Sequence, residues 1–343
     1  MVEVTEESTP SPITFPSVTK QDIDYCSIIE WYPKFARYSI PTVFVPLSEE
    51  FISYLSSDSV YVAGMNTSHS YEYDVDSDSD SSNSEVDSHD STNLVEFPEL
   101  DLLVEKAVEE LGGSIFPKLN WSSPKDAAWI AFGNSLECTK PADIYILLKS
   151  SDFIIHDLFH AYEYCQQVSE SPQFNLALRE WRKIDSAYEF RCFIRNNQLI
   201  GVCQRDIRQY YSFLTDIKDN LLDAIEEFFD AKVQNKFPSA NYVLDVYCTN
   251  QFYVRIVDFN PFIPSTDPLL FEWSELLVQE FNEPVFRYNK SADEAQSNQP
   301  AYTHNRLPKE AFDFSENSTI AEFAQRFQQE LELQARNNEH VNH

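Results

Sequence analysis

The hydrophobic and polar positions between residues 174 and 262 alternate as they do in half-buried strands. Residues 189–195 and 198–205 flank the turn dipeptide Asn196-Asn197, which predicts a hairpin. Residues 241–247 and 253–259 predict a second hairpin, and residues 176–181 a further strand. Between the two hairpins, residues 215–233 carry apolar side chains at helical spacing, so we expect one amphipathic helix there.

The first half of the chain mixes shorter helices and strands. Strands are predicted at residues 41–46, 60–64 and 114–121, and helices at residues 49–55 and 98–111. Residues 143–148 are apolar but too few for periodicity to separate helix from strand. Asp267-Pro268 predicts the start of another helix that runs to about residue 281. Helices interspersed with hairpins favour an α+β class with mainly antiparallel sheets.

Composition divides the chain into segments. Residues 68–92 are rich in serine and aspartate and contain no lysine or arginine, so we expect a disordered acidic insertion. The alternative is a phosphorylated acidic arm, since serines beside acidic residues suit acidophilic kinases. The predicted segments are a flexible N-terminus (1–21), an N-terminal lobe (22–175), a C-terminal lobe (176–288) and a polar tail (289–343) with a helix at about 319–334.

Charge and composition narrow the classes of function. The 343 residues include 43% hydrophobic residues, enough for a sizeable core, and carry a formal net charge of −31. Such a chain is repelled by phosphate backbones, so we expect no nucleic-acid partner and favour a protein partner with a basic face. With only five glycines, the chain has no Rossmann or Walker loop. Six scattered cysteines, an acidic N-terminus and the lack of a long apolar run predict a cytoplasmic protein with no membrane contact.

The second hairpin contains a candidate magnesium site. Asp258 and Asn260 are two residues apart and share one face of a strand. A symmetric loop at residues 249–252 would place Asp245 opposite Ile256 and diagonal to Asp258, about 7–8 Å away. Two carboxylates and an amide oxygen are hard ligands of the kind that magnesium shares with phosphates. The alternative is ordinary turn chemistry, in which Asn260-Pro261 ends a strand and Asp258 is solvated.

Lysine and arginine side chains provide candidate phosphate ligands. Lys118 precedes a loop whose amides and Ser122 and Ser123 hydroxyls suit a phosphate, and Lys125 adds charge. The alternative is a surface lysine before a turn. Arg205, at a strand end, has the paired donors that recognise a γ-phosphate.

Two further patterns have structural interpretations. Glu189 and Arg191 alternate with apolar residues in a strand and are candidate nucleotide-binding residues, although a mutual ion pair is the simpler interpretation. His156 and His160 have the spacing of a zinc-protease helix, but aspartate replaces its glutamate and no third ligand is evident, so we do not predict zinc.

Several motifs occur in an order that resembles the cell division cycle protein 123 family. The similarity covers residues 22–288 apart from the acidic insertion. The motifs are residues 31–35 (WYPKF), 40–42 (IPT), 116–127 (FPKLNWSSPKDA), 178–181 (LREW), 189–193 (EFRCF), 204–206 (QRD) and 257–262 (VDFNPF).

This resemblance implies an ATP-grasp-like fold of two lobes that binds ATP and magnesium. It places Lys118 and the loop of Ser122, Ser123, Lys125 and Ala127 at the phosphates. It places Leu178, Arg179, Glu180 and Trp181 at the adenine, as a hinge. Asp245, Asp258 and Asn260 would hold the magnesium. The loop lacks the glycines of most ATP-grasp enzymes, which argues against a mobile, rapidly turning-over loop.

The resemblance also implies a chaperone of assembly. Members of the family bind the γ subunit of translation initiation factor 2 and promote its joining to the α and β subunits, which links them to cell-cycle progression. We expect a monomer that binds ATP with no small-molecule catalysis and at most a weak ATPase. The alternative is an ATP-grasp ligase that joins a carboxylate to an amine through an acyl phosphate, for which the same magnesium and lysine set would serve.

Overall fold

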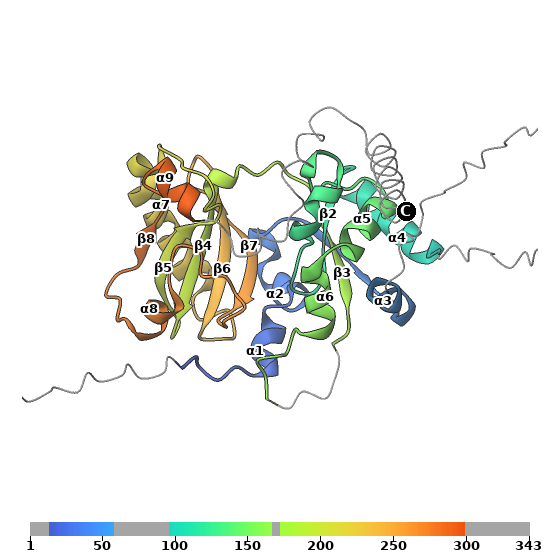
Figure 1. The fold of residues 1–343 in the computed structure, drawn as a ribbon, viewed down its shortest axis with the longest axis horizontal. Helices are drawn as coiled ribbons and strands as arrows, with labels where there is room; N and C mark the ends of the chain where they lie inside the picture. Colours follow the sequence, from blue (N-terminus) through green and yellow to red (C-terminus); the bar gives the residue numbers. More distant parts are fainter. Residues whose placement is uncertain (1–13, 58–95, 167–171, 299–343) are drawn as a thin grey trace, which may run out of the picture.

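The protein has two lobes, each built on its own β-sheet (Figure 1). The computed structural model describes residues 14–57, 96–166 and 172–298. The predicted strand at residues 60–64, the acidic insertion at 68–92 and the helix at 319–334 lie outside these residues. Within the described part of the chain, no helix has the length and apolar character needed to cross a membrane.

The first lobe contains a three-stranded antiparallel sheet in the order β1-β3-β2. Its strands are β1 (Thr42–Pro46), β2 (Ile115–Lys118) and β3 (Asn175–Glu180). The sheet packs with α3 (Glu49–Ser56), α4 (Pro98–Glu110), α5 (Pro141–Lys149) and α6 (Asp152–Phe159) around a core that includes Phe51, Tyr145 and Leu178. Residues 143–148, left open by the sequence, are helical in α5.

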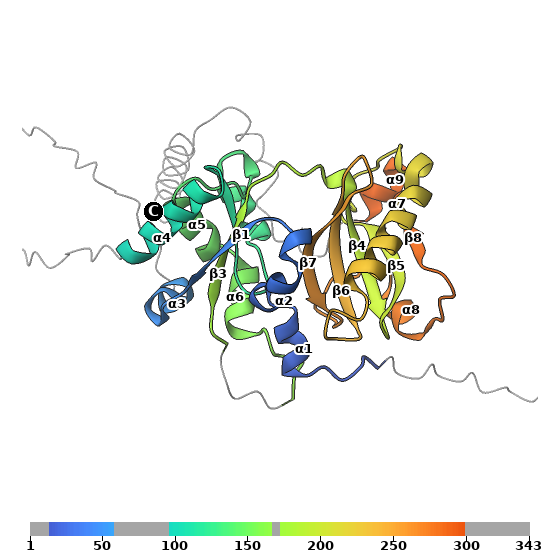
Figure 2. The same ribbon diagram turned by 180° about the vertical axis from the view of Figure 1, so that it is seen from behind.

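The second lobe contains a five-stranded sheet in the order β7-β6-β4-β5-β8. The strands are β4 (Glu189–Arg195), β5 (Gln198–Gln204), β6 (Tyr242–Cys248), β7 (Val254–Pro261) and β8 (Val285–Arg287). All pairings are antiparallel except that of β5 with β8. The helices are α7 (Leu214–Phe228), α8 (Trp273–Val278) and α9 (Ala292–Ser297), and α7 lies across one face of the sheet (Figure 2).

The two predicted hairpins and the amphipathic helix are confirmed. Asn196 and Asn197 form the first turn with positive φ angles of 53° and 61°, which asparagine tolerates well. The predicted helix at 215–233 is α7 followed by a π-helical turn, Phe229–Val233. The predicted helix start at Asp267-Pro268 is wrong: α8 begins only at Trp273, and Leu269 has a φ angle of 58° that no α-helix contains.

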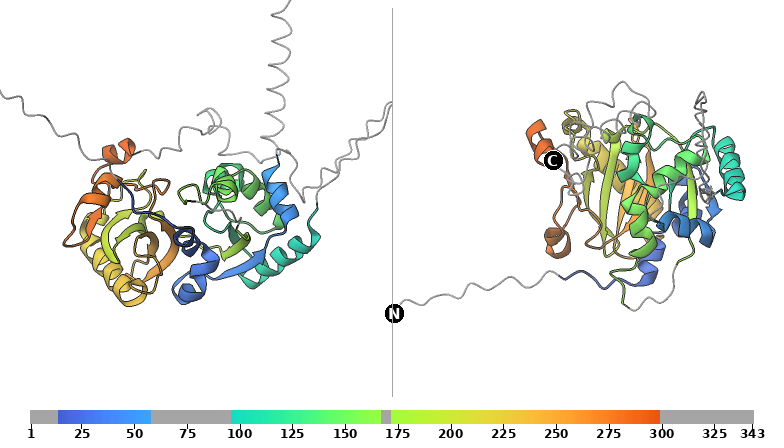
Figure 3. Two further views of the ribbon diagram at one scale, coloured as in Figure 1. Left: turned by 90° about the horizontal axis from the view of Figure 1, so that it is seen from below. Right: turned by 45° about the vertical axis from the view of Figure 1, so that its right-hand side comes forward.

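The chain crosses between the lobes more often than the sequence predicted. Helices α1 (Lys20–Tyr25) and α2 (Ile28–Phe35) lie between the lobes (Figures 1 and 3), and Trp31 and Phe35 of α2 belong to the core of the second lobe. Both rings contact Phe259 of β7 at centroid distances of 5.3 Å. Conversely, β3 is the central strand of the first sheet. The predicted boundary between residues 175 and 176 is therefore displaced, because the first sheet needs β3 to join β1 to β2.

One close contact in the second lobe predicts a measurable destabilisation. A Cβ atom on Gly201 of β5 would lie 2.7 Å from the Phe271 ring. We expect Gly201→Ala to lower the free energy of unfolding in urea by about 1–3 kcal/mol through overpacking. Combining it with Phe271→Leu should recover part of this loss. An unchanged urea midpoint for the single variant would contradict this packing argument.

Candidate functional site

A cleft of about 790 Å³ separates the two lobes. Most of the residues predicted from the sequence line it: Ser122, Ser123, Lys125, Arg179, Trp181, Glu189, Arg191, Arg205, Asp258 and Asn260. Lys118 and Asp245 are buried beside them. Ala127 and Leu178 lie in the core of the first lobe, and Glu180 forms an ion pair with Arg182 at 2.7 Å. The structure therefore brings together all but three of the predicted residues.

The register of the second hairpin differs from the prediction. Asp245 lies directly opposite Asp258 rather than diagonal to it. Cys248 pairs with Val254, so the loop between the strands has five residues, one more than the predicted four, and this shifts the register once. A β-bulge at Val257 shifts it again, since Val246 pairs with Ile256. Both shifts act in the same direction and bring the two carboxylates closer than predicted.

Asp245 is surrounded by cations. Its two carboxylate oxygens accept hydrogen bonds from Nε and Nη2 of Arg191, both at 2.8 Å, and Nε of Arg205 lies 3.2 Å from Oδ2. Asn260 also donates to Asp245 Oδ2 at 3.2 Å. Burial raises the pKa of Asp245, but the charges of Arg191 and Arg205 outweigh it and hold that pKa well below its usual range. The expected pair of Arg191 with Glu189 is replaced by this bidentate pair with Asp245.

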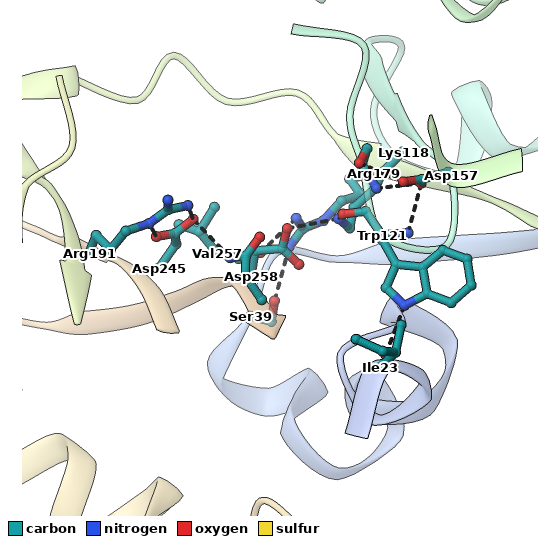
Figure 4. A network of polar contacts seen from close by, with 12 residues as sticks. Ile23, Ser39, Lys118, Trp121, Asp157, Arg179, Arg191, Asp245, Val257 and Asp258 are labelled. Atoms are coloured by element: carbon teal, nitrogen blue, oxygen red, sulfur yellow. Dashed lines mark hydrogen bonds and ion pairs between the residues drawn. The ribbon is translucent and has the colours of Figure 1, made fainter. Parts of the chain in front are cut away.

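Lys118 and Asp258 form an ion pair that joins the two lobes (Figure 4). The Nζ atom of Lys118, at the end of β2, lies 2.7 Å from Oδ2 of Asp258 on β7 and also donates to the Trp121 carbonyl. Lys118 is 1% exposed, so it is not a surface lysine. The other oxygen of Asp258, Oδ1, is buried and accepts no hydrogen bond from the described residues. A buried carboxylate oxygen without a partner is costly unless a cation or donor reaches it.

Arg179 supports the junction from the first lobe. It donates to the Val257 carbonyl at 2.8 Å and to the Ser39 hydroxyl at 3.1 Å, and it is 1% exposed (Figure 4). Burial lowers its pKa to about 10, although the Asp258 charge opposes this shift. Trp181, two residues after Arg179, packs edge-to-face against Phe116 with a centroid distance of 6.1 Å. This pair gives one wall of the cleft an aromatic surface.

Lys125 supplies a cation with a perturbed pKa. Repulsion from Arg205, followed by partial desolvation in the cleft, lowers the pKa of Lys125 to about 8. An anion placed between Lys125 and Arg205 would relieve this repulsion. The two side chains come from different lobes, so such an anion would bridge the cleft.

Asp157 is a site residue that the sequence analysis missed. This buried α6 carboxylate accepts hydrogen bonds from the Trp121 and Ser122 amides and from the Ser122 hydroxyl, at 3.2, 2.8 and 2.7 Å. Burial raises its pKa, while these donors and the Lys118 charge oppose the shift. The signal was present in the sequence, because Asp157 stands three residues after the buried Ile154 on the inner face of a helix.

The ligand set fits a magnesium nucleotide. Among the described residues, no three or more histidine, cysteine or acidic side chains are grouped so as to hold a metal ion. Asp258, with its unpartnered oxygen, and the Asn260 amide offer hard oxygens, so phosphates would have to complete the shell, as magnesium commonly requires. Asp245 is committed to two arginines and would have to share its oxygens. The Nε2 atom of His156 lies 3.5 Å from Oε1 of Glu163.

Two lobes that each carry a mainly antiparallel sheet, facing each other across a charged cleft, define an α+β protein of the ATP-grasp-like type. The fold class predicted from the sequence is thus confirmed. The D123 family model matches residues 31–315, and the chain belongs to this family.

Relatives and solved structures agree with this assignment. The chain is 39% identical to a translation initiation factor eIF2 assembly protein of Xenopus tropicalis, over 86% of this chain and 92% of that protein. It is 40% identical to a protein of the same name from Botryotinia fuckeliana, over 80% of this chain and 69% of that protein. The structure of C-terminally truncated Cdc123 from Schizosaccharomyces pombe superimposes with a TM-score of 0.67 at 34% identity, covering 80% of this chain and 99% of that one.

The charges around Asp245 predict a large and pH-dependent contribution to stability. Asp245→Asn leaves Arg191 and Arg205 without their shared counter-ion, so we expect a loss of about 3–5 kcal/mol in the free energy of unfolding in urea at pH 7. Because the pKa of Asp245 is depressed in the folded protein, its contribution to the free energy of unfolding is complete above the pKa that it has in the unfolded chain. This contribution is lost as the pH falls from that value towards the pKa of the folded protein. The difference from wild type should therefore narrow below about pH 4.

A matched control is Asp219→Asn, which alters an aspartate whose side chain is 83% exposed in a surface ion pair with Lys218. It should change stability by less than about 1 kcal/mol at every pH. A loss of similar size in both variants would show that Asp245 has no special electrostatic role.

Proposed function

We propose that this protein binds ATP with magnesium in the cleft between its lobes and uses the complex to support assembly of translation initiation factor 2. The observation that carries the nucleotide part is the buried Lys118–Asp258 pair, in which Asp258 keeps one unpartnered oxygen. A lysine and a carboxylate at one point suit a phosphate and its metal ion, respectively.

The remaining cleft residues supply the other contacts of a nucleotide. Lys125 and Arg205 both line the cleft, and a triphosphate would relieve the repulsion between their charges. Trp181 and Phe116 offer an aromatic wall for a base. Asp258 and Asn260, with Asp245 beside them, would hold the magnesium ion, which would neutralise phosphate charge when bound. Lys118 would then exchange its partner Asp258 for a phosphate oxygen.

The assembly part of the proposal rests on the relatives. Proteins named for assembly of initiation factor 2 match most of this chain at 33–40% identity. We propose that the chain acts as a cytoplasmic monomer, binds the γ subunit and promotes its joining to the α and β subunits, thereby supporting translation initiation and cell-cycle progression. Its net charge of −31 favours a partner with a basic face. No described feature favours the ligase alternative.

The nucleotide site can be tested by isothermal titration calorimetry with ATP and magnesium. Wild-type protein should bind, and EDTA should weaken the binding. Asp258→Asn preserves the shape of the side chain but removes its charge, so we expect affinity to fall roughly 30-fold or more, equivalent to about 2 kcal/mol. The surface variant Asp219→Asn serves as the control. Equal affinity of wild type and Asp258→Asn would remove Asp258 from the site.

The partner can be tested with purified components. Immobilised wild-type protein should retain the purified γ subunit in the presence of ATP and magnesium and should not retain the isolated α subunit. Asp258→Asn should retain less of the γ subunit if the nucleotide supports assembly. Failure of the wild-type protein to retain the γ subunit would sink the assembly proposal without affecting the nucleotide site.

A further inference from the structure

Helix α6 and the loop after β2 are joined by two carboxylates that point in opposite directions. Asp157 of α6 accepts hydrogen bonds from the amides of Trp121 and Ser122 and from the Ser122 hydroxyl. Asp157 is 2% exposed, and its two oxygens are both used. A buried carboxylate held by three donors fixes the start of the loop firmly.

The second carboxylate comes from the loop. Asp126 accepts hydrogen bonds from the Ser151 hydroxyl at 2.5 Å and from the Asp152 and Phe153 amides at 2.7 and 3.3 Å. These donors lie at the beginning of α6, where a negative charge is favourable. Residues 121–126 are thus held at both ends by one helix. We call this arrangement, Asp157 with Trp121 and Ser122 and Asp126 with residues 151–153, the reciprocal clamp.

Further contacts fix the same loop from other sides. Trp121 donates through Nε1 to the Ile23 carbonyl at 2.9 Å, and its own carbonyl accepts from Lys118. The Leu119 amide donates to the Ser122 carbonyl at 2.8 Å and closes the turn. Residues 119–126 contain no glycine and one proline. Contacts within the protein therefore hold this loop from several sides.

The clamp also decides which loop groups remain for a ligand. The Ser122 amide and hydroxyl, predicted to cradle a phosphate, are both engaged by Asp157. Ser123 and Lys125 line the cleft between the two halves of the clamp. Their position depends on a loop that is held before any ligand arrives, which reduces the ordering that binding requires.

We propose that Asp157 and Asp126 are positioning residues of the nucleotide site, which hold residues 121–126 so that Ser123 and Lys125 meet the phosphates in a preformed loop. This inference rests on the proposed nucleotide function. It assigns Ser122 to the clamp instead of to the ligand. The opposite arrangement, in which Asp157 competes with a phosphate for the Ser122 donors, makes the contrary prediction that removing its charge strengthens binding.

The test compares ATP with AMP, because the loop meets the phosphates beyond the first. Asp157→Asn replaces one acceptor oxygen with an amide group that cannot accept from Ser122. In calorimetry with magnesium present, we expect the affinity for ATP to fall roughly tenfold, while the affinity for AMP changes less than twofold. Asp126→Asn should act in the same direction. The control is Asp143→Asn, whose carboxylate accepts hydrogen bonds from the Thr139 and Lys140 amides at the start of α5, away from the loop. It should leave the affinities for ATP and for AMP unchanged.

Hydrogen exchange provides a readout that does not depend on the nucleotide. The Trp121 and Ser122 amides should exchange slowly in the wild type and faster in Asp157→Asn, whereas the amides of β3 should keep their protection. Should Asp157→Asn fail to fold, Ser122→Ala removes only the 2.7 Å hydroxyl bond. It should weaken ATP binding severalfold and leave AMP binding unchanged.

The outcomes separate the inference from the proposed function. Unchanged or tighter ATP binding by Asp157→Asn, with wild-type protein binding ATP, would overturn the positioning role and leave the nucleotide site intact. Equal losses for ATP and AMP would also overturn it, since they would indicate a general structural defect. No binding of ATP by the wild type would remove the nucleotide function and this inference together.

Discussion

The ion pair between Lys118 and Asp258 is the contact on which the relation of the two lobes depends. It joins the last residue of β2 to the middle of β7, and both partners are largely removed from water. A buried charge is tolerated only when it is paired, and removing one partner of such a pair costs about 3–5 kcal/mol. The same two side chains would contact a phosphate and its metal. The interaction that joins the two walls of the cleft is therefore the one that a ligand would rearrange.

The rest of the junction is arranged around this pair. Arg179 donates a hydrogen bond to the Val257 carbonyl, at the bulge that places Asp258 opposite Asp245. Ser39 donates to the neighbouring Ile256 carbonyl at 2.9 Å and accepts from Arg179. The bulge in β7 is thus fixed by side chains of both lobes. A change in the position of β3 would move Arg179, and with it the strand that carries Asp258 and Asn260.

Local pattern was sufficient for several elements but not for the pairing of the strands. The hairpins, α4 and α7 follow from periodicity and turn residues, which act within a few positions of the chain. The register of Asp245 and Asp258 depends on a bulge that is held by Arg179, 78 residues away from its partner Val257, and no local signal encodes it. The same reason explains why residues 28–35 were placed in the N-terminal lobe: Trp31 contacts Phe259, which is more than 200 residues away in the sequence. Asp157 was missed because its donors lie 35 and 36 residues earlier in the chain. The candidate metal ligands Asp245, Asp258 and Asn260 were predicted from strand alternation in the second hairpin, and the family motifs added the residues at the adenine.

Charge in the cleft differs from charge on the whole chain, and this difference bears on the form of the ligand. Six basic and six acidic side chains line the cleft, whereas acids outnumber basic residues by more than two to one in the sequence. The cleft basic residues are Lys125, Arg179, Arg182, Arg191, Arg205 and Arg208. The field of the whole protein repels a free polyphosphate at long range, and a locally balanced cleft does little to reverse this. Complexation with magnesium lowers the charge that must approach and supplies the cation that the free Asp258 oxygen lacks. The acidic surface and the unpartnered carboxylate therefore favour the same ligand form, a nucleotide that arrives with its metal ion bound.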